Sequence, residues 1–92
     1  MRVLLHTTAD KYLKRLNAKD RDRIKEALRD LAKDPPEGDI MPYEGSPGIM
    51  RLRVGSLRVI FRFRDEETIL VTYIEPRGQA YTKKTKTNRG KK

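Results

Sequence analysis

Apolar residues in the first third of the chain recur at intervals of three and four, which is the spacing of an amphipathic helix. The first such stripe consists of Ala9, Tyr12, Leu13 and Leu16. The second consists of Ile24, Ala27, Leu28, Leu31 and Ala32. Thr8 and Asn17 precede the two stripes and are residue types that cap helix N-termini, whereas Pro35 ends the second stripe because proline lacks an N–H. The pattern therefore predicts a helical hairpin.

Elsewhere the apolar residues alternate with polar ones or form short β-prone runs, which indicates strands. Residues 2–6 predict a first strand before the helices. Three further runs follow the helices, at 49–54, 57–64 and 68–75. Residues 34–48 hold four of the five prolines and three of the six glycines, so this segment is predicted to be a loop.

Gly55-Ser56 joins two of these runs and is typical of a two-residue β-hairpin turn of type II′, with Gly at the position of positive φ. The register that follows pairs Val54 with Leu57, Arg53 with Arg58, Leu52 with Val59 and Arg51 with Ile60. It places Arg51, Arg53 and Arg58 on one face of the hairpin. The opposite face, expected to pack on the helices, carries Leu57, Val59, Phe61 and Phe63.

The element order is β-α-α-β-β-β, which predicts an α+β fold: an N-terminal strand, an α-helical hairpin and a three-stranded antiparallel β-meander in one twisted sheet. A chain of 92 residues allows one such domain, expected over residues 1–82. Residues 83–92 contain six basic residues and neither acidic nor apolar ones, so they are predicted to form a disordered tail.

The charge of the chain gives information about its binding partner. The formal net charge is +9, from 22 basic and 13 acidic residues. Residues 1–50 carry 10 basic and 9 acidic groups, net +1, whereas residues 51–92 carry 12 basic and 4 acidic groups, net +8. This imbalance favours a polyanionic partner, either a nucleic acid or an acidic protein.

Several classes of site are excluded or made improbable by composition. The absence of Cys excludes disulfides, thiolate metal sites and a cysteine nucleophile, and the single His argues against a metal site built from several histidines. We therefore predict neither a metal nor a cofactor. The apolar runs are far shorter than the roughly 20 residues of a membrane span, and the N-terminal run is too short for a signal peptide. The protein is expected to be cytoplasmic and to have no membrane partner.

The strongest chemical signal is a cluster of arginines on the predicted hairpin. Five arginines and no acidic residue occur from position 51 to position 64, and Arg77 and Tyr81 follow the last predicted strand. Arginines directly opposed across a hairpin are either well solvated or arranged to bind an anion, and the clustering favours phosphate. Nearby cations favour the phenolate of a tyrosine, so Tyr81 is a candidate general base or a base-stacking group, with a core or lid aromatic as the other interpretation.

The hairpin segment 50–62, Met-Arg-Leu-Arg-Val-Gly-Ser-Leu-Arg-Val-Ile-Phe-Arg, resembles that of the RelE/ParE toxin superfamily of type II toxin–antitoxin systems. The resemblance includes the preceding helical hairpin and the segment 74–81, Ile-Glu-Pro-Arg-Gly-Gln-Ala-Tyr, and covers residues 2 to about 82. Its most specific part is the Arg-Leu-Arg-Val-Gly and Arg-Val-Ile-Phe hairpin followed by a basic and then a Tyr position. The chain looks like a RelE-like member.

The resemblance implies a metal-independent endoribonuclease that cleaves mRNA in the ribosomal A site by attack of a ribose 2′-OH on the adjacent phosphate, and so inhibits translation. The catalytic residues that it implies are Arg53, Arg58, Arg77 and Tyr81. Tyr81 or Arg53 would lie near the 2′-OH, Arg58 at the scissile phosphate and Arg77 near the leaving group. The RNA- and phosphate-binding residues would be Arg51, Arg62, Lys83 and Lys84. Glu75-Pro76 stands where many relatives have a His, which leaves the identity of the acid and the base open.

The partners implied are a RelB-like antitoxin, acidic and partly disordered, together with the ribosome and its mRNA. An acidic segment ordered over the arginines would block them, and the charge of the second half of the chain would attract it. Two alternatives stay open at this point. One is a ParE-type inhibitor of DNA gyrase that cleaves no RNA, and the other is a nucleic-acid-binding module whose activity has decayed.

Overall fold

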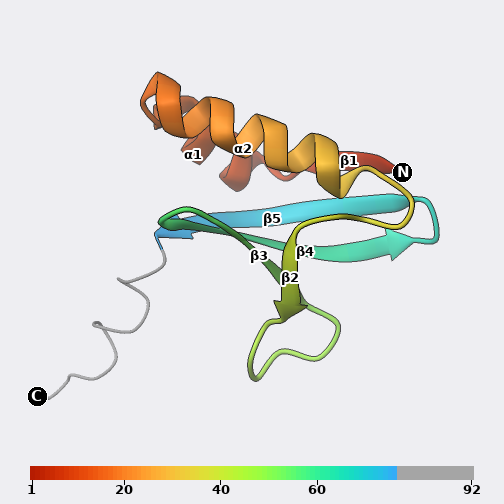
Figure 1. Cartoon of the computed structure of the whole chain (residues 1–92). Helices are drawn as coiled ribbons and strands as arrows, with labels where there is room; N and C mark the ends of the chain where they lie inside the picture. The colour runs from red at the N-terminus through yellow and green to blue at the C-terminus, as the bar shows by residue number, and fades with distance from the viewer. Residues whose placement is uncertain (77–92) are drawn as a thin grey trace, which may run out of the picture.

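A helical hairpin covers one face of a five-stranded sheet in the computed structural model of the chain, which describes residues 1–76 (Figure 1). The elements in chain order are β1 (Arg2–Leu5), α1 (Thr7–Arg15), α2 (Ala18–Leu31), β2 (Asp39–Pro42), β3 (Met50–Val54), β4 (Leu57–Asp65) and β5 (Thr68–Pro76). The predicted tail and four of the predicted site residues lie outside the described residues: Arg77, Tyr81, Lys83 and Lys84. No helix in residues 1–76 is both long enough and apolar enough to cross a bilayer.

The strand order in the sheet is β1-β5-β4-β3-β2, with β1 parallel to β5 and the other pairs antiparallel. The predicted α+β class, the helical hairpin and the meander are confirmed. The sheet has one strand more than predicted, because β2 lies inside the segment expected to be a loop. Pro42 is compatible with this strand because β2 is at the edge of the sheet, where a missing N–H removes no ladder bond.

Gly38, directly before β2, explains how the connection from α2 reaches the sheet edge. Its φ is +137°, and a Cβ at this position would lie 2.6 Å from Cδ1 of Leu52. Only glycine fits both the backbone conformation and the close approach to the core. The strand then pairs with β3 in the register Asp39 to Arg53 and Met41 to Arg51.

The two helices are capped by side chains at their N-termini. Asn17 caps α2 as predicted, because its Oδ1 accepts a hydrogen bond from the N–H of Asp20 at 2.9 Å. The prediction that Thr8 caps α1 is wrong, since the helix begins at Thr7 and the cap is His6. Nδ1 of His6 accepts a hydrogen bond from the N–H of Thr8 at 3.2 Å, so the one histidine of the chain has a structural role.

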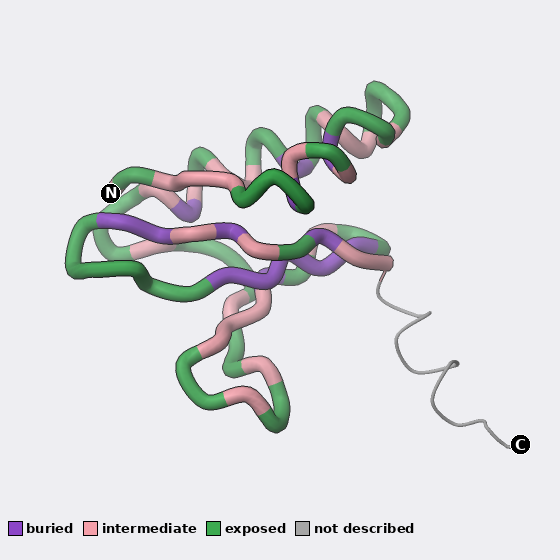
Figure 2. The backbone as a smooth tube through the Cα atoms, turned by 180° about the vertical axis from the view of Figure 1, so that it is seen from behind, coloured by how far each residue is buried: buried purple, intermediate pink, exposed green. Residues whose placement is uncertain are grey.

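The core lies between the helices and the sheet. Figure 2 shows that much of the buried backbone belongs to the central strands β4 and β5. The largest fully buried side chains are Phe61, Ile24, Leu31, Leu52, Ile69, Val59 and Val71. The predicted apolar stripes of both helices reach this core, with Ala9 and Leu13 buried from α1 and Ile24 and Leu31 buried from α2.

The predicted hairpin at Gly55-Ser56 has the register expected from the sequence, with Val54 opposite Leu57 and Arg53 opposite Arg58. Gly55 has a φ of +58°, as the turn requires. Leu57, Val59 and Phe61 face the helices as predicted, and all three are buried.

The prediction that Phe63 also packs under the helices is wrong, because its side chain is 48% exposed. In residues 1–76, β3 pairs with β4 no farther than Phe61, so Phe63 lies where β4 has a strand on one side. Its ring contacts the edge of the Phe61 ring at 6.0 Å between centroids. Two register shifts, between Ile60 and Phe61 and between Phe63 and Asp65, interrupt the β4–β5 pairing around it.

Candidate nucleic-acid interface

The face of the sheet opposite the helices, here called the open face, carries a row of four charged residues. The charged row is Asp39, Arg53, Arg58 and Glu75, one from each of the strands β2, β3, β4 and β5. Each member is the Cα partner of the next across the sheet. Because opposed side chains of antiparallel strands share a face, the row runs as negative, positive, positive, negative.

A second row on the open face lies two residues away along each strand. This mixed row consists of Met41, Arg51, Ile60 and Tyr73. Met41 and Tyr73 at its ends are 51% and 53% exposed, which is unusual for large apolar side chains on a sheet. Ile60 between them is buried although it lies outside the core cluster under the helices. The open face therefore offers exposed apolar surface beside its charged row.

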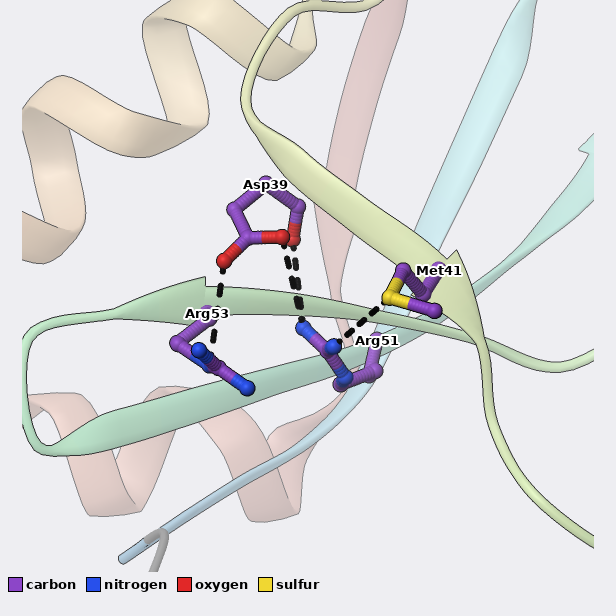
Figure 3. A network of polar contacts seen from close by, with 4 residues as sticks. All are labelled: Asp39, Met41, Arg51 and Arg53. Carbon is purple, nitrogen blue, oxygen red and sulfur yellow. Dashed lines mark hydrogen bonds and ion pairs between the residues drawn. The ribbon is translucent and has the colours of Figure 1, made fainter.

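Asp39 joins the two rows at the β2 edge (Figure 3). Its carboxylate is 3.7 Å from a guanidinium nitrogen of Arg51 and 3.7 Å from Nε of Arg53. Arg51 also donates from Nη1 to the backbone carbonyl of Asp39 at 3.4 Å and from Nη2 to Sδ of Met41 at 3.0 Å. The Arg53–Asp39 pair is about half-exposed on both sides, and exposed ion pairs at this distance contribute little to stability; Arg51 is 13% exposed. A phosphate that approaches the same two arginines therefore competes with only a weak intramolecular partner.

Arg58 and Glu75 form a second and much drier pair in the middle of the open face. Their side chains are 7% and 20% exposed, and a guanidinium N–H of Arg58 donates to Oε2 of Glu75. Tyr43, from the segment between β2 and β3, covers them: its ring centroid is 5.5 Å from Cζ of Arg58 and its hydroxyl donates to Oε2 of Glu75 at 3.4 Å. Cation–π contact and charge-assisted hydrogen bonding together offset the desolvation of both charges.

The sequence placed Arg53 opposite Arg58 and left open whether the two cations are solvated or bind an anion. The structure gives each of them its own carboxylate, on opposite sides: Asp39 for Arg53 and Glu75 for Arg58. Sequence analysis missed both carboxylates as partners. One signal was available, since pairing residues outward from a turn at Glu66-Glu67 sets Arg58 opposite Glu75.

The predicted phosphate-binding residues are only partly gathered. Arg51, Arg53 and Arg58 lie together on the open face. Arg62 is exposed on β4 four residues beyond Arg58, about 13 Å along a strand, and is not part of either row. Pro76, the last described residue, follows Glu75 on β5 and pairs with Leu57, so the chain leaves the described region beside the Glu75 end of the charged row.

Metal coordination has no candidate in this part of the molecule. Residues 1–76 contain no group of three or more His, Asp or Glu side chains arranged to hold a metal ion. The chemistry available on the open face is therefore that of guanidinium groups, two carboxylates and phenols.

Residues 3–81 match the family model described as the ParE toxin of the type II toxin–antitoxin system parDE. No match was found among curated protein sequences.

Solved structures of toxin–antitoxin complexes are similar over most of the chain. One is the archaeal RelE–RelB complex of Pyrococcus horikoshii OT3, with 28% identity, a TM-score of 0.68 and coverage of 85% of this chain and 96% of that one. Another is the RelBE2 complex of Mycobacterium tuberculosis, with 26% identity, a TM-score of 0.70 and coverage of 83% and 96%. The isolated RelE toxin of E. coli, at 17% identity and a TM-score of 0.67 over 82% of each chain, shares the fold.

Proposed function

This chain belongs to the ParE toxin family of type II toxin–antitoxin systems, within the RelE/ParE superfamily, and on that premise we propose that it is a ribosome-dependent endoribonuclease that cuts mRNA. The observation that carries the proposal is the pair Arg51 and Arg53. Both guanidinium groups reach one half-exposed carboxylate, Asp39, at ion-pair distances of 3.7 Å. An RNA phosphate presents the same negative oxygens to the same two cations, with better bidentate geometry.

The proposed reaction is an internal transfer at one phosphate. A base removes the proton of a ribose 2′-OH, and the oxygen attacks the adjacent phosphorus to form a 2′,3′-cyclic phosphate. The bond to the 5′ oxygen breaks, and an acid gives that oxygen a proton. Cations that contact the non-bridging oxygens stabilise the additional charge of the transition state.

The residues proposed for these steps are Arg53, Arg58, Arg77 and Tyr81. Arg53, near the surface, can contact substrate directly. Arg58 is covered by Tyr43, so its contact with a phosphate requires that the Tyr43 ring move away. The roles of Arg77 near the leaving group and of Tyr81 near the 2′-OH belong to the segment after Pro76, outside the described residues.

We further propose that an acidic, RelB-like antitoxin covers the open face. The similar structures from P. horikoshii and M. tuberculosis are toxin–antitoxin complexes, which supports an antitoxin partner for this chain. An acidic segment would compete for Arg51 and Arg53 in the way that Asp39 does. If the substrate is mRNA on the ribosome, the free toxin acts in the cytoplasm.

Inducible expression in a bacterial host tests the proposal, with mRNA 5′ ends mapped by primer extension. Wild type is expected to arrest growth and to create new 5′ ends inside translated reading frames. Arg53→Ala is expected to lose both effects, whereas Arg64→Ala, an exposed arginine outside both rows, keeps them. New 5′ ends that persist unchanged in Arg53→Ala would overturn the assignment of the site.

A second candidate function is the inhibition of DNA gyrase, favoured by the match of residues 3–81 to the ParE model. Growth arrest without mRNA cleavage, together with loss of gyrase supercoiling activity in the presence of purified toxin, would support it over the nuclease. The absence of both arrest and cleavage, with salt-sensitive RNA binding, would instead indicate a binding module without activity.

A further inference from the structure

A cleft of about 240 Å³ lies between α1 and β5, away from the arginines of the open face. Its lining residues are Thr8, Lys11, Tyr12, Arg15, Tyr73 and Ile74. The cleft exists because β1 pairs with β5 only as far as Val71, opposite Leu5, after which the chain turns into α1. The β5 residues between Val71 and Pro76 therefore have a helix rather than a strand at their side.

The cleft carries two cations, both from α1. Lys11 and Arg15 are four residues apart, so they project from the same face of α1, and both are exposed. None of the lining residues is acidic. Among residues 1–76, the ion pair on this helix joins Lys14 to Asp10 at 3.1 Å. These two residues precede Arg15 and Lys11 in the sequence and do not line the cleft. Within residues 1–76, Lys11 and Arg15 form no ion pair, in contrast to the arginines of the charged row.

Two aromatic rings and an apolar floor complete the cleft. Tyr73 is half-exposed, and Ile74, the next residue of β5, is buried in the core cluster. Tyr12 is half-buried, and burial, together with the charges of Asp20 and Glu75, raises the pKa of its phenol above the usual value. Flat apolar surface beside paired cations matches a nucleotide, whose base stacks and whose phosphate is anionic.

Tyr73 connects the cleft to the open face, because it is also the last member of the mixed row that contains Arg51. Two strand spacings separate these residues in the sheet, about 10 Å. A single strand of RNA that rests a phosphate on Arg51 and Arg53 therefore reaches Tyr73 within a short length of backbone. We propose that the α1–β5 cleft binds a nucleotide of single-stranded RNA flanking the one held by the arginines, with its base on Tyr73 and its phosphate at Lys11 and Arg15. The inference rests on the proposed function and deepens it.

The test is the affinity of a short fluorescent single-stranded RNA, 2′-O-methylated so that it cannot be cut, measured by anisotropy over a range of salt concentrations. Tyr73→Ala is expected to weaken binding about fivefold or more, as loss of one stacked base does, and Tyr73→Phe to bind like wild type. Lys11→Ala with Arg15→Ala is expected to lower the slope of log K against log salt by about 0.7, because one neutralised phosphate is lost.

The matched control is Lys25→Ala with Arg29→Ala, which removes one lysine and one arginine at the same spacing from exposed positions of α2. It is expected to bind like wild type. If the cleft variants bind like wild type while Arg51→Ala with Arg53→Ala weakens binding, the cleft proposal is wrong and the proposed function stands. If the arginine double variant also leaves RNA binding unchanged, both are wrong.

The same variants separate RNA from a protein occupant. If Tyr73→Ala weakens the binding of the antitoxin and leaves RNA affinity unchanged, the cleft is a protein-docking surface and the RNA proposal is overturned. Thermal unfolding of each variant excludes loss of fold as the cause of any change. The cleft and control variants are expected to match wild type because their mutated side chains are exposed.

Discussion

Arg58 on β4 and Glu75 on β5 lie directly opposite one another and form an ion pair beneath the ring of Tyr43. The pair makes the centre of the open face electrically neutral and dry. Arg53, next to it, is 44% exposed, whereas Arg51 is only 13% exposed, and the two share the half-exposed carboxylate of Asp39 at 3.7 Å. The three arginines therefore differ in their surroundings within one sheet: Arg58 is held by a dry ion pair, whereas Arg51 and Arg53 share a more exposed carboxylate.

Glu75→Gln is predicted to destabilise the fold by about 2–3 kcal/mol, because it leaves the Arg58 charge desolvated without a counter-charge. The estimate lies below the range for a completely buried pair because Glu75 retains some exposure. Urea unfolding monitored by circular dichroism measures the change.

A double variant separates the pair from its surroundings. Arg58→Met with Glu75→Leu replaces both charges with apolar groups and is expected to recover most of the lost stability. Equal destabilisation in the single and double variants would show that the ion pair is not the reason for the loss.

Asp39→Asn is predicted to increase affinity for single-stranded RNA by about three- to tenfold, because the carboxylate no longer competes for Arg51 and Arg53. Stability is expected to change by less than about 1 kcal/mol, as for other exposed ion pairs. Anisotropy titrations and thermal unfolding measure the two effects. Weaker RNA binding in this variant would contradict the competition.

Phe61→Ala and Phe63→Ala are predicted to differ although the residues are two positions apart on one strand. Phe61 is completely buried, so its truncation is expected to cost about 3–5 kcal/mol through cavity formation. Phe63 is half-exposed, and its loss is expected to cost less than about 1.5 kcal/mol, mainly from the contact of the two rings. Chemical denaturation of both variants measures the two losses of stability. Equal losses would contradict the difference in burial between Phe61 and Phe63.

Asp65 is predicted to make stability depend on pH in the acid range. The N–H of Glu67, which donates to Oδ1 at 2.8 Å, and the side chain of Thr68 hold the pKa of Asp65 below its usual value. A lowered folded pKa stabilises the protein above the unfolded value, about 3.9, and this contribution disappears as the pH falls through the folded pKa. The stability difference between wild type and Asp65→Asn is therefore expected to shrink on acidification, and a constant difference from pH 6 downward would contradict it.

Local sequence signals predicted the parts of the fold that depend on neighbouring residues. The Gly55-Ser56 turn determines which residues of β3 and β4 are opposed, so the positions of Arg51, Arg53 and Arg58 followed from counting. Asn17 before an apolar stripe was sufficient for the start of α2. These features require no information from distant parts of the chain.

The remaining features depend on tertiary contacts. The short strand β2 lies in a segment rich in Pro and Gly, and it forms because β3 offers it an edge to pair with. The burial of Arg58 depends on Tyr43 and Glu75, which are distant from it in the sequence and meet only when the sheet is complete. The exposure of Phe63 follows from the end of the β3 pairing, which alternation of residues does not reveal.

The most direct test of the account is cleavage of a defined mRNA by the purified toxin, with and without ribosomes programmed with that mRNA. The account predicts cuts in the A-site codon that require the ribosome. It predicts a cleavage rate at least about 100-fold lower for Arg51→Ala with Arg53→Ala, although the thermal unfolding of this variant stays that of wild type. Cleavage by this double variant at the wild-type rate, or no cleavage by wild type on programmed ribosomes, would contradict it.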